Sequence, residues 1–495
     1  MRLPKPLKHF TESEDGAVLV LWSLALVVFL GLLGVIFDIG RLGTTQSELQ
    51  SYADSISLAA AAELDGDADA LTRARAAADN LIFDTQTYAE GDKILSGPED
   101  VTLIFYQPGP DGRFARDAAL VTTNPYRARF VEARIDNHKV APGLGAAFAA
   151  LSDAPELSGE VSAYAVSGFS LEACNVAPVA MCLPSVEFDA RSAIGSTLEL
   201  EASVDVTQLV PGQITAFHSL TNALDGLTVC AGLLGGDLEA CLLAARQPET
   251  ACTGQGGLVL STSLDGNDVM DAINTRFDTF SGVASQFTAN PLFSAAPNIL
   301  TGMTSSGGAC GLMSGQIDTS LEDYALPADD CIETGACGIM GDGNWDTGRA
   351  AYVEAYYQGE EPFPAAKTRF EFYQKEIATY ADGGLALTAD QLLDLLGGQG
   401  GLLGLVGNQQ QADFCAPQQN MDPSRRLMVI AGIDCSSGAV DATVSAPPVQ
   451  EFFEVFTLGP VRDGKLKVEI SACLGGDCGK GNLDTEIHDI IRLVE

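Results

Sequence analysis

An uninterrupted apolar run, AVLVLWSLALVVFLGLLGVIF, extends from Ala17 to Phe37 and contains no charged residue. Its 21 residues are enough, as a helix, to cross a hydrocarbon core, which needs about 20. The run is longer than the apolar core of a secretory signal, and no small-x-small cleavage site follows it. We therefore predict an uncleaved transmembrane helix over residues 17–37.

Beyond this run, apolar residues recur at helical spacing with polar residues between them. They are Leu42, Leu49, Tyr52, Ala53, Ile56, Ala59, Ala60 and Leu64. This period predicts that the anchor helix continues outside the membrane as an amphipathic helix. Asp65-Gly66-Asp67 supplies the turn that ends it, and a second, Ala-rich helix is expected over residues 68–80.

The rest of the chain favours strands. Alternating apolar and polar residues predict strands over 101–106, 130–136 and 157–165, with a short Ala-rich helix near 143–151. Apolar segments separated by Gly, Pro and Asp turns predict three more strands, over 426–433, 452–457 and 466–472. The fold class is therefore α+β, with mixed and mostly antiparallel sheet.

The composition limits the class of partner. The chain has 66 acidic residues against 27 Lys and Arg, a formal charge of −39, which repels phosphate backbones and anionic headgroups. Nucleic acid is therefore not an expected partner. Apolar residues are 46% and charged residues 19% of 495 residues, so the chain is expected to fold around more than one core.

All twelve cysteines follow the predicted membrane span, and the first is Cys174. No Cys-x-x-Cys pair occurs and the four histidines are scattered, so the spacing predicts disulfides in an oxidising compartment instead of a zinc site. Cys230, Cys241 and Cys252 are evenly spaced in and after a Leu/Ala-rich segment, 224–245, which would place them near one face of a helix or helical hairpin.

Three cysteine pairs are close enough in sequence to be disulfide candidates. They are Cys331 with Cys337, Cys473 with Cys478, and Cys415 with Cys435. Spacing alone leaves the connectivity open.

Charge around the span predicts its orientation. Arg2, Lys5 and Lys8 precede the span, whereas only Arg41 follows it closely. Basic residues are retained on the cytoplasmic side, so residues 1–16 are expected to form a cytoplasmic tail and the bulk of the chain to lie outside the cytoplasm.

One segment carries candidate metal ligands. Asp342, Asn344 and Asp346 alternate as oxygen-bearing side chains do at the start of a calcium loop. The sixth position of that loop is Thr347 instead of glycine, and no glutamate stands at the twelfth, so a turn around Trp345 is the favoured interpretation. No other cofactor is expected.

Catalytic motifs are missing from the sequence. It contains no Gly-x-Ser-x-Gly elbow, no His-Glu-x-x-His helix and no phosphate-binding loop that ends in Gly-Lys-Ser/Thr. We therefore predict that the protein is not an enzyme and has no catalytic residues.

Residues 15–64 resemble the N-terminal segment of TadE/TadG-like Flp pilus-assembly proteins. The resemblance is carried by the apolar span, by Asp38, Gly40 and Arg41 at its outer end, and by the stretch Leu49-Gln50-x-x-Ala53-Asp54-Ser55 with the alanine run that follows. The long region after this segment indicates the TadG-like branch. Pilin-type precursors carry a glutamate five residues after the processed glycine, and here that position is Leu21, which favours a permanently anchored component.

The resemblance implies an accessory component of Flp/Tad (type IVc) pilus assembly or surface adherence. Such a protein would be a single-pass protein of the inner membrane of a Gram-negative bacterium, largely periplasmic, and would contact pseudopilin-like and pilus-platform proteins. The expected domains are the tail 1–16, the transmembrane helix 17–37, a pilin-like helix plus small α+β module over 38–170, and a cysteine-containing region over 171–495. A Ca²⁺-dependent adhesin and an anchored periplasmic hydrolase are the alternatives.

Overall fold

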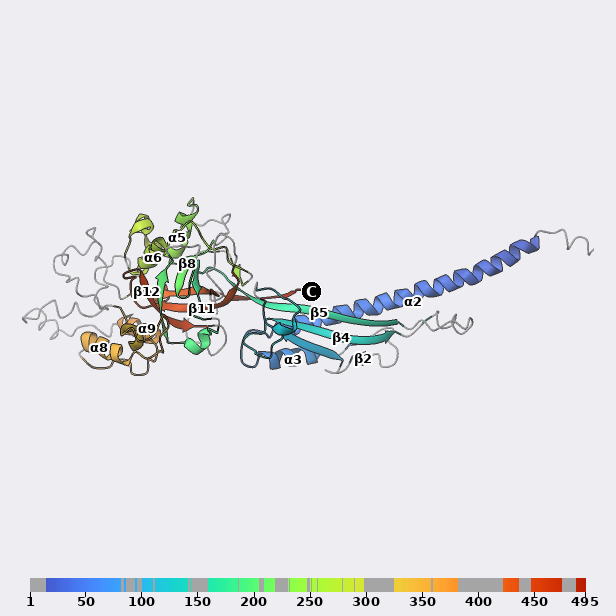
Figure 1. Ribbon diagram of the computed structural model, residues 1–495, viewed down its shortest axis with the longest axis horizontal. Helices are drawn as coiled ribbons and strands as arrows, with labels where there is room; N and C mark the ends of the chain where they lie inside the picture. The colour runs from blue at the N-terminus through green and yellow to red at the C-terminus, as the bar shows by residue number, and fades with distance from the viewer. Residues whose placement is uncertain are drawn as a thin grey trace, which may run out of the picture. The chain divides into compact units, whose positions relative to one another are not determined.

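The chain forms two compact units in the computed structural model (Figure 1). The structure describes residues 15–81, 84–85, 94–95, 100–109, 112–140, 143, 159–185, 187–203, 209–218, 230, 232–246, 250, 252–255, 257–277, 279–288, 290–297, 325–357, 359–381, 422–435, 447–473 and 487–495. The first unit comprises Met1–Pro108, Phe114–Phe169 and Ile491–Glu495, and the second comprises Gly109–Arg113 and Ser170–Ile490.

The first unit begins with α2 (Asp15–Ala61), a helix of 47 residues, which is followed by α3 (Ala70–Leu81). Gly66 lies in the turn between them at φ +92°, a conformation that glycine adopts without steric cost. Arg73 of α3 donates hydrogen bonds to the carboxylates of Glu63 and Asp65 at 2.6 Å, so the turn is tied to the start of α3.

A sheet with the strand order β13-β5-β4-β3 completes the first unit. Its strands are β3 (Val101–Tyr106), β4 (Phe130–Val140), β5 (Gly159–Ala173) and β13 (Ile487–Leu493). β3 with β4 and β4 with β5 pair antiparallel. The short elements are the ribbon of β1 (Asp84–Thr85) and β2 (Ile94–Leu95) and the 3₁₀ turn η1 (Ala118–Leu120).

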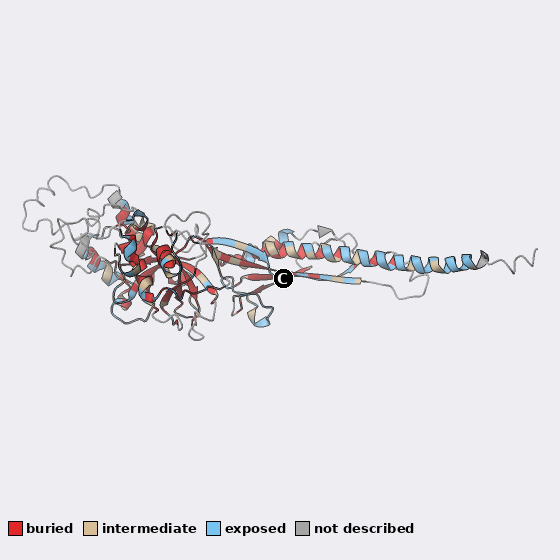
Figure 2. Cartoon of the chain, turned by 90° about the horizontal axis from the view of Figure 1, so that it is seen from above, coloured by how far each residue is buried: buried red, intermediate tan, exposed pale blue. Residues whose placement is uncertain are grey.

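The C-terminal part of α2 packs on this sheet. Its buried face repeats at helical spacing and consists of Thr45, Leu49, Tyr52, Ala53, Ile56, Ser57, Ala60 and Ala61. In Figure 2 these positions appear as red stripes on a helix that is otherwise pale blue towards its N-terminus. Hydrophobic burial on one face, together with polar contacts to β5, holds this part of the helix in place.

The second unit is built on a closed barrel with the strand order β10-β11-β12-β7-β8-β6. Its strands are β6 (Val179–Cys182), β7 (Thr197–Ala202), β8 (Gln213–Ala216), β10 (Leu427–Ile433), β11 (Val449–Thr457) and β12 (Lys465–Ala472). The β10/β6 and β7/β8 pairs are parallel and the others antiparallel. β9 (Thr253–Gly254) pairs with the end of β5.

Two helices cover the barrel and share its core. They are α5 (Gly236–Ala244) and α6 (Gly266–Asn274). Asp265 begins α6 with a capping box, because its carboxylate accepts from the N–H groups of Asn267 and Asp268 and the Asp268 carboxylate accepts in return. The 3₁₀ turns of this unit are η2 (Ala190–Ala193), η3 (Thr275–Phe277), η4 (Gly282–Phe287), η5 (Pro291–Phe293) and η7 (Pro423–Arg426).

A second, aromatic core lies between the barrel and three further helices. These are α7 (Asp330–Glu333), α8 (Asp346–Tyr357) and α9 (Arg369–Ala381). Phe372 of α9 makes edge-to-face contacts with Trp345 and Tyr352, with ring centroids 6.0 and 5.8 Å apart. Phe456 of β11 joins the same cluster, so α8 and α9 are attached to the barrel by aromatic packing.

The sequence prediction of a long N-terminal helix and a mostly antiparallel α+β fold is confirmed. The strand expected over 101–106 is β3, and the three strands expected near the end of the chain are β10, β11 and β12. That these strands close a six-stranded barrel was not predicted. The helix expected near 143–151 lies outside the described residues except for Gly143.

Candidate functional site

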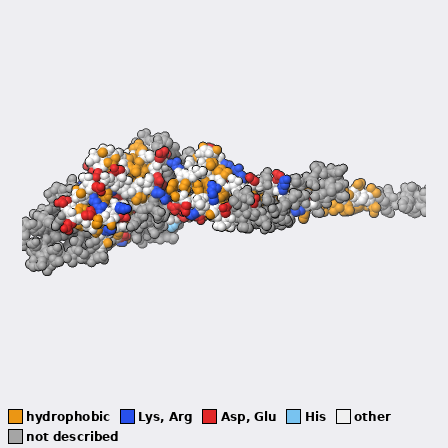
Figure 3. Space-filling view, turned by 90° about the horizontal axis from the view of Figure 1, so that it is seen from below, with side chains coloured by type: hydrophobic (Ala, Val, Ile, Leu, Met, Phe, Trp, Pro, Cys, Tyr) orange, Lys and Arg blue, Asp and Glu red, His pale blue; other side chains and the backbone are white. Residues whose placement is uncertain are grey.

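The N-terminal half of α2 exposes nearly all of its apolar side chains. Leu19 is 75%, Trp22 65% and Phe37 51% exposed, and this stretch is almost entirely orange at the right of Figure 3. By length and composition the helix is able to cross a membrane. Exposed apolar surface of this extent is unfavourable in water and favourable in lipid, which makes this half of α2 a candidate membrane contact.

Polar side chains fix the second half of α2 to the backbone of β5. Gln46 donates to the carbonyl of Ser162 at 2.8 Å, and Gln50 donates to the carbonyl of Tyr164 at 2.9 Å. Buried hydroxyls of Ser57 and Ser167 lie 2.7 Å apart. The side-chain register between α2 and β5 is therefore determined by hydrogen bonds as well as by burial.

Asp38 and Arg41 lie where α2 changes from exposed to packed. The Asp38 carboxylate accepts a hydrogen bond from the N–H of Gly143 at 3.0 Å. A Cβ added at Gly143 would be 2.5 Å from Asp38 Oδ1 and 2.6 Å from Arg41 Nη1, so a larger residue here would displace these side chains. These two motif residues therefore position the chain just beyond β4.

An open groove of about 890 Å³ runs along another side of α2, beside the end of α3. Its lining is mostly small and polar: Gly40, Gly43, Thr44, Ser47, Glu48, Ser51, Tyr52, Ser55 and Leu81. No neighbouring atom lies within 4 Å of the position that a Cβ would take at Gly40 or Gly43. Small side chains on a helix allow another helix to approach closely, so this groove is a candidate protein contact.

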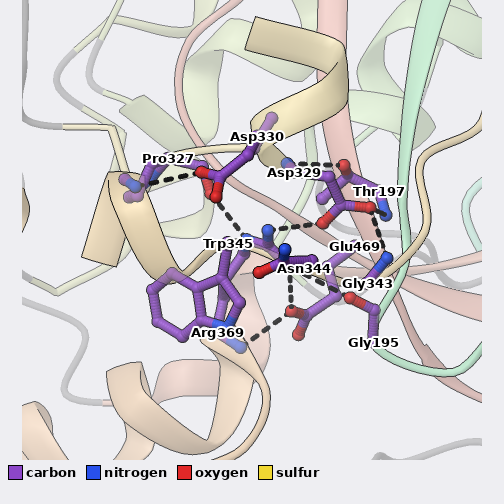
Figure 4. Close-up of polar contacts among 12 residues, drawn as sticks. Gly195, Thr197, Pro327, Asp329, Asp330, Gly343, Asn344, Trp345, Arg369 and Glu469 are labelled. Atoms are coloured by element: carbon purple, nitrogen blue, oxygen red, sulfur yellow. Dashed lines mark hydrogen bonds and ion pairs between the residues drawn. The ribbon is translucent and has the colours of Figure 1, made fainter. Parts of the chain in front are cut away.

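The candidate calcium ligands are exposed: Asp342 and Asn344 lie in the loop before α8, and Asp346 is the first residue of that helix. The buried Trp345 stands next to Asn344 (Figure 4). The Asp342 carboxylate accepts from the N–H of Asn344 at 3.1 Å, and the Asn344 side chain accepts from the N–H of Asp346 at 3.1 Å. Two of the three oxygen-bearing side chains thus stabilise turns. Among the described residues, no group of three or more His, Cys, Asp or Glu side chains is arranged to hold a metal ion.

Asp330 anchors the same loop to the first turn of α8. Its carboxylate accepts from the N–H groups of Thr347 and Gly348 at 3.0 and 3.1 Å, which satisfies two of the helix's unpaired donors. Burial acts to raise the pKa of Asp330, but these hydrogen bonds outweigh it and lower the pKa.

Beneath this loop lies a buried charge cluster that the sequence analysis did not find. Arg369 donates to Asp329 at 2.6 Å and to Glu469 at 3.1 Å, and all three side chains are fully buried (Figure 4). The Asp329 carboxylate also accepts from the N–H groups of Thr197 and Gly343. Burial raises the pKa of Glu469, and Arg369 opposes that rise. The cluster joins β7, β12, α9 and the loop into one structure.

Two further arginines, at the end of η7 directly before β10, are buried. Arg425 donates to the carbonyls of Ala244 and Ala245 at the end of α5, at 2.7 and 3.1 Å, where the helix dipole is negative. The Arg426 guanidinium lies 4.7 Å from the ring centroid of Tyr373 and 5.4 Å from that of Phe456. Burial lowers the pKa of both arginines. The sequence offers one signal that these arginines are buried: they are consecutive and directly precede an apolar strand.

Four disulfides join cysteines of the described residues. They are Cys174–Cys252, Cys182–Cys435, Cys230–Cys241 and Cys331–Cys337. The last is one of the local pairs expected from spacing, and Cys473 is also disulfide-bonded. Cys415 and Cys478 lie outside the described residues.

Two expectations about the cysteines are wrong. Cys435 pairs with Cys182 instead of Cys415, because β10 and β6 are neighbouring parallel strands that place Ile433 opposite Cys182. The three evenly spaced cysteines do not share a helix, since only Cys241 lies in α5 (Gly236–Ala244), whereas Cys230 precedes it and Cys252 comes just before the short β9. Sequence spacing could not reveal that β10 pairs with β6, or that β9, next to Cys252, pairs with the end of β5.

One cluster of the second unit combines a serine, a carboxylate and a histidine. The buried Glu239 carboxylate pairs with His218 Nδ1 through one oxygen and accepts from the Ser261 hydroxyl through the other. In a nucleophilic triad the imidazole stands between the hydroxyl and the carboxylate, so that it can remove the hydroxyl proton. Here the carboxylate stands in the middle, so the cluster does not have the order of such a triad.

The fold and these surfaces define a class of protein: a long helix with an exposed apolar half, packed on a sheet and followed in the chain by a disulfide-linked barrel. Residues 16–63 match the family model "Putative Flp pilus-assembly TadE/G-like". The match confirms the resemblance seen in the sequence and supports involvement in Tad pilus assembly. No curated protein matches the chain, and no solved structure matches it.

Proposed function

We propose that this protein is an inner-membrane-anchored accessory component of Flp/Tad pilus assembly that acts through protein–protein contacts. One observation carries the proposal: the TadE/G-like match over 16–63 coincides with α2, from its exposed apolar half to the half packed on the sheet. The matched segment is therefore both the membrane helix and the support of the first unit.

The groove beside α2 is the contact that we assign to assembly partners. Its open side presents Gly43, Ser47 and Ser51 at intervals of four residues, and it begins directly after the apolar half of the helix. A pseudopilin-like helix that emerges from the same membrane would meet this face with its backbone close to α2. No chemistry is required of the protein in this role.

The second unit is assigned to the periplasm. Basic residues precede the span and disulfides stabilise the barrel, and an oxidising compartment is where such bonds persist. The unit would provide a stable extracytoplasmic body, held together by four described disulfides and the buried Arg369 cluster.

A deletion strain tests the proposal. Loss of the protein should abolish or reduce pili and surface attachment, and expression of the wild-type chain should restore both. Filling the groove with Ser47→Leu and Ser51→Leu should block restoration while the protein is still made, whereas Thr123→Leu, an exposed position of the same unit, serves as the control. Unchanged piliation and attachment in the deletion strain would refute the assignment.

A further inference from the structure

We propose that the end of the sheet formed by β4 and β5 lies in the lipid headgroup layer, next to the point where α2 leaves the membrane. The ligand is the phospholipid headgroup, and the contact is made by Lys139, Gly143 and Gly159. Because this inference rests on the proposed membrane span, the test below separates the two.

Strand β5 runs alongside α2 towards the proposed span. Contacts descend together along both elements: Ser57 meets Ser167, Gln50 meets Tyr164, and Gln46 meets Ser162. Figure 1 shows β4 and β5 beside α2 over this stretch. Each step towards the N-terminus of α2 is therefore a step towards the start of β5.

The ends of β4 and β5 lie close to Leu42 of α2. Gly159 begins β5 and faces Val140, the last residue of β4. A Cβ at Gly159 would be 2.1 Å from Leu42 Cδ2, so the strand end lies against that leucine. Beyond Val140, Gly143 fits between Asp38 and Arg41, one turn lower on the helix.

The heights of Gly143 and Gly159 along α2 fall close to the end of the proposed span. A helix rises about 1.5 Å per residue, so Leu42 lies about 7.5 Å beyond Phe37 along the helix axis. The headgroup layer is roughly 5–8 Å thick on each side of the hydrocarbon core. Gly143, at the level of Asp38, and Gly159, at the level of Leu42, therefore both fall within that layer. Helix tilt would bring them closer to the hydrocarbon.

The charges at this end fit a local contact. Lys139 is exposed and pairs across the strands with the exposed Glu160, so one cation and one anion face the headgroup dipole. The chain as a whole carries −39 charges, which disfavours wide adhesion to an anionic bilayer and favours a contact confined to this end. Between the two strands, residues 141–142 and 144–158 lie outside the described residues.

Depth-dependent quenching of tryptophan fluorescence tests the proposal. The full chain is reconstituted in phosphatidylcholine vesicles, and the quencher is a phospholipid whose acyl chains are brominated near the headgroup. The chain has two tryptophans, and Trp345 is buried in the second unit. In a Trp22→Phe parent, Lys139→Trp should lose fluorescence to the brominated lipid. The matched control is Tyr126→Trp. Tyr126 is exposed and lies just before β4 begins at Phe130, at the opposite end of the strand from Lys139, so a tryptophan there should not be quenched. Glu160→Trp repeats the measurement if Lys139→Trp folds poorly.

The outcomes separate the inference from the proposed function. Quenching at 139 or 160 without quenching at 126 supports the headgroup contact. If Trp22 of the wild-type chain is quenched by acyl-chain bromine but positions 139 and 160 are not, the contact is refuted and the span stands. Failure to quench Trp22 refutes the span and the inference with it, and equal quenching at 126 and 139 refutes a contact confined to the β4–β5 end.

Discussion

Glu376 should make the second unit less stable as the pH rises through neutrality. Its side chain is fully buried on α9 and accepts from the hydroxyls of Tyr352 and Tyr357 on α8, at 3.0 and 2.7 Å. Burial raises the pKa of Glu376 from 4.5 to about 7, while the two hydroxyls and the charge of Arg426 act to lower it.

The sign follows from linkage between protonation and folding. The folded state holds the Glu376 proton more tightly than the unfolded state, whose pKa is 4.5, so the stabilisation is complete below pH 4.5. It is lost as the pH rises through the folded-state pKa of about 7. The pKa difference of roughly 2.5 corresponds to a loss of about 3 kcal/mol at about 1.4 kcal/mol per unit.

The variant Glu376→Gln removes the titration and keeps a carbonyl oxygen that accepts from the tyrosines. Urea unfolding of the full-length chain in detergent, followed by circular dichroism, would compare variant and wild type between pH 4.5 and roughly pH 8. The variant should gain up to about 3 kcal/mol relative to wild type across this range. The control Glu360→Gln, an exposed position, should show no such gain. A constant difference between Glu376→Gln and wild type at every pH would refute the reasoning.

Three further predictions concern the second unit. Arg369→Met should destabilise it by about 3–5 kcal/mol because two buried carboxylates lose their cation. The control Lys465→Met, at an exposed ion pair, should cost less than about 1 kcal/mol. Thermal unfolding measures both losses, and equal losses would contradict this prediction. Cys435→Ser opens a link across 253 residues and Cys331→Ser one across 6, so losses near 5 and 2 kcal/mol respectively are expected from denaturant midpoints, and the reverse order would count against it. Calorimetry with millimolar Ca²⁺ should show no binding heat at Asp342, Asn344 and Asp346, since Asp342 and Asn344 are directed at backbone N–H groups of their own turns; binding heat would favour the calcium interpretation.

The elements that sequence analysis predicted well are those with a local cause. The long apolar helix, β3 and the last three barrel strands follow from runs and alternations that each segment carries in itself. Closure of the barrel depends on parallel pairing of β10 with β6, which are about 250 residues apart. No local pattern encodes such a pairing, so the barrel and the partner of Cys435 could be found only in three dimensions.

The charged residues of the site were missed for a related reason. Arg369 begins a helix and Glu469 lies in a strand, and each looks like an ordinary surface charge in its own segment. They are buried because Asp329 comes from a third segment and completes the cluster. A charged side chain is predicted to be exposed unless its partner is known, and the partners here are separated by 40 and 100 residues.

Asp38 and Arg41 connect the family resemblance to a physical role. As sequence they are only part of a motif at the outer end of an apolar run, and such a motif could serve a peptidase, a partner or the fold. In the structure they lie three positions apart on α2, where the exposed apolar half ends, and both approach Gly143. A carboxylate and a guanidinium are costly inside lipid and inside a dry core, and the boundary between the two is where they are tolerated. The motif therefore marks the level at which the helix passes from its exposed apolar half to the half packed on the sheet, and it attaches the β4 end of the sheet at that level.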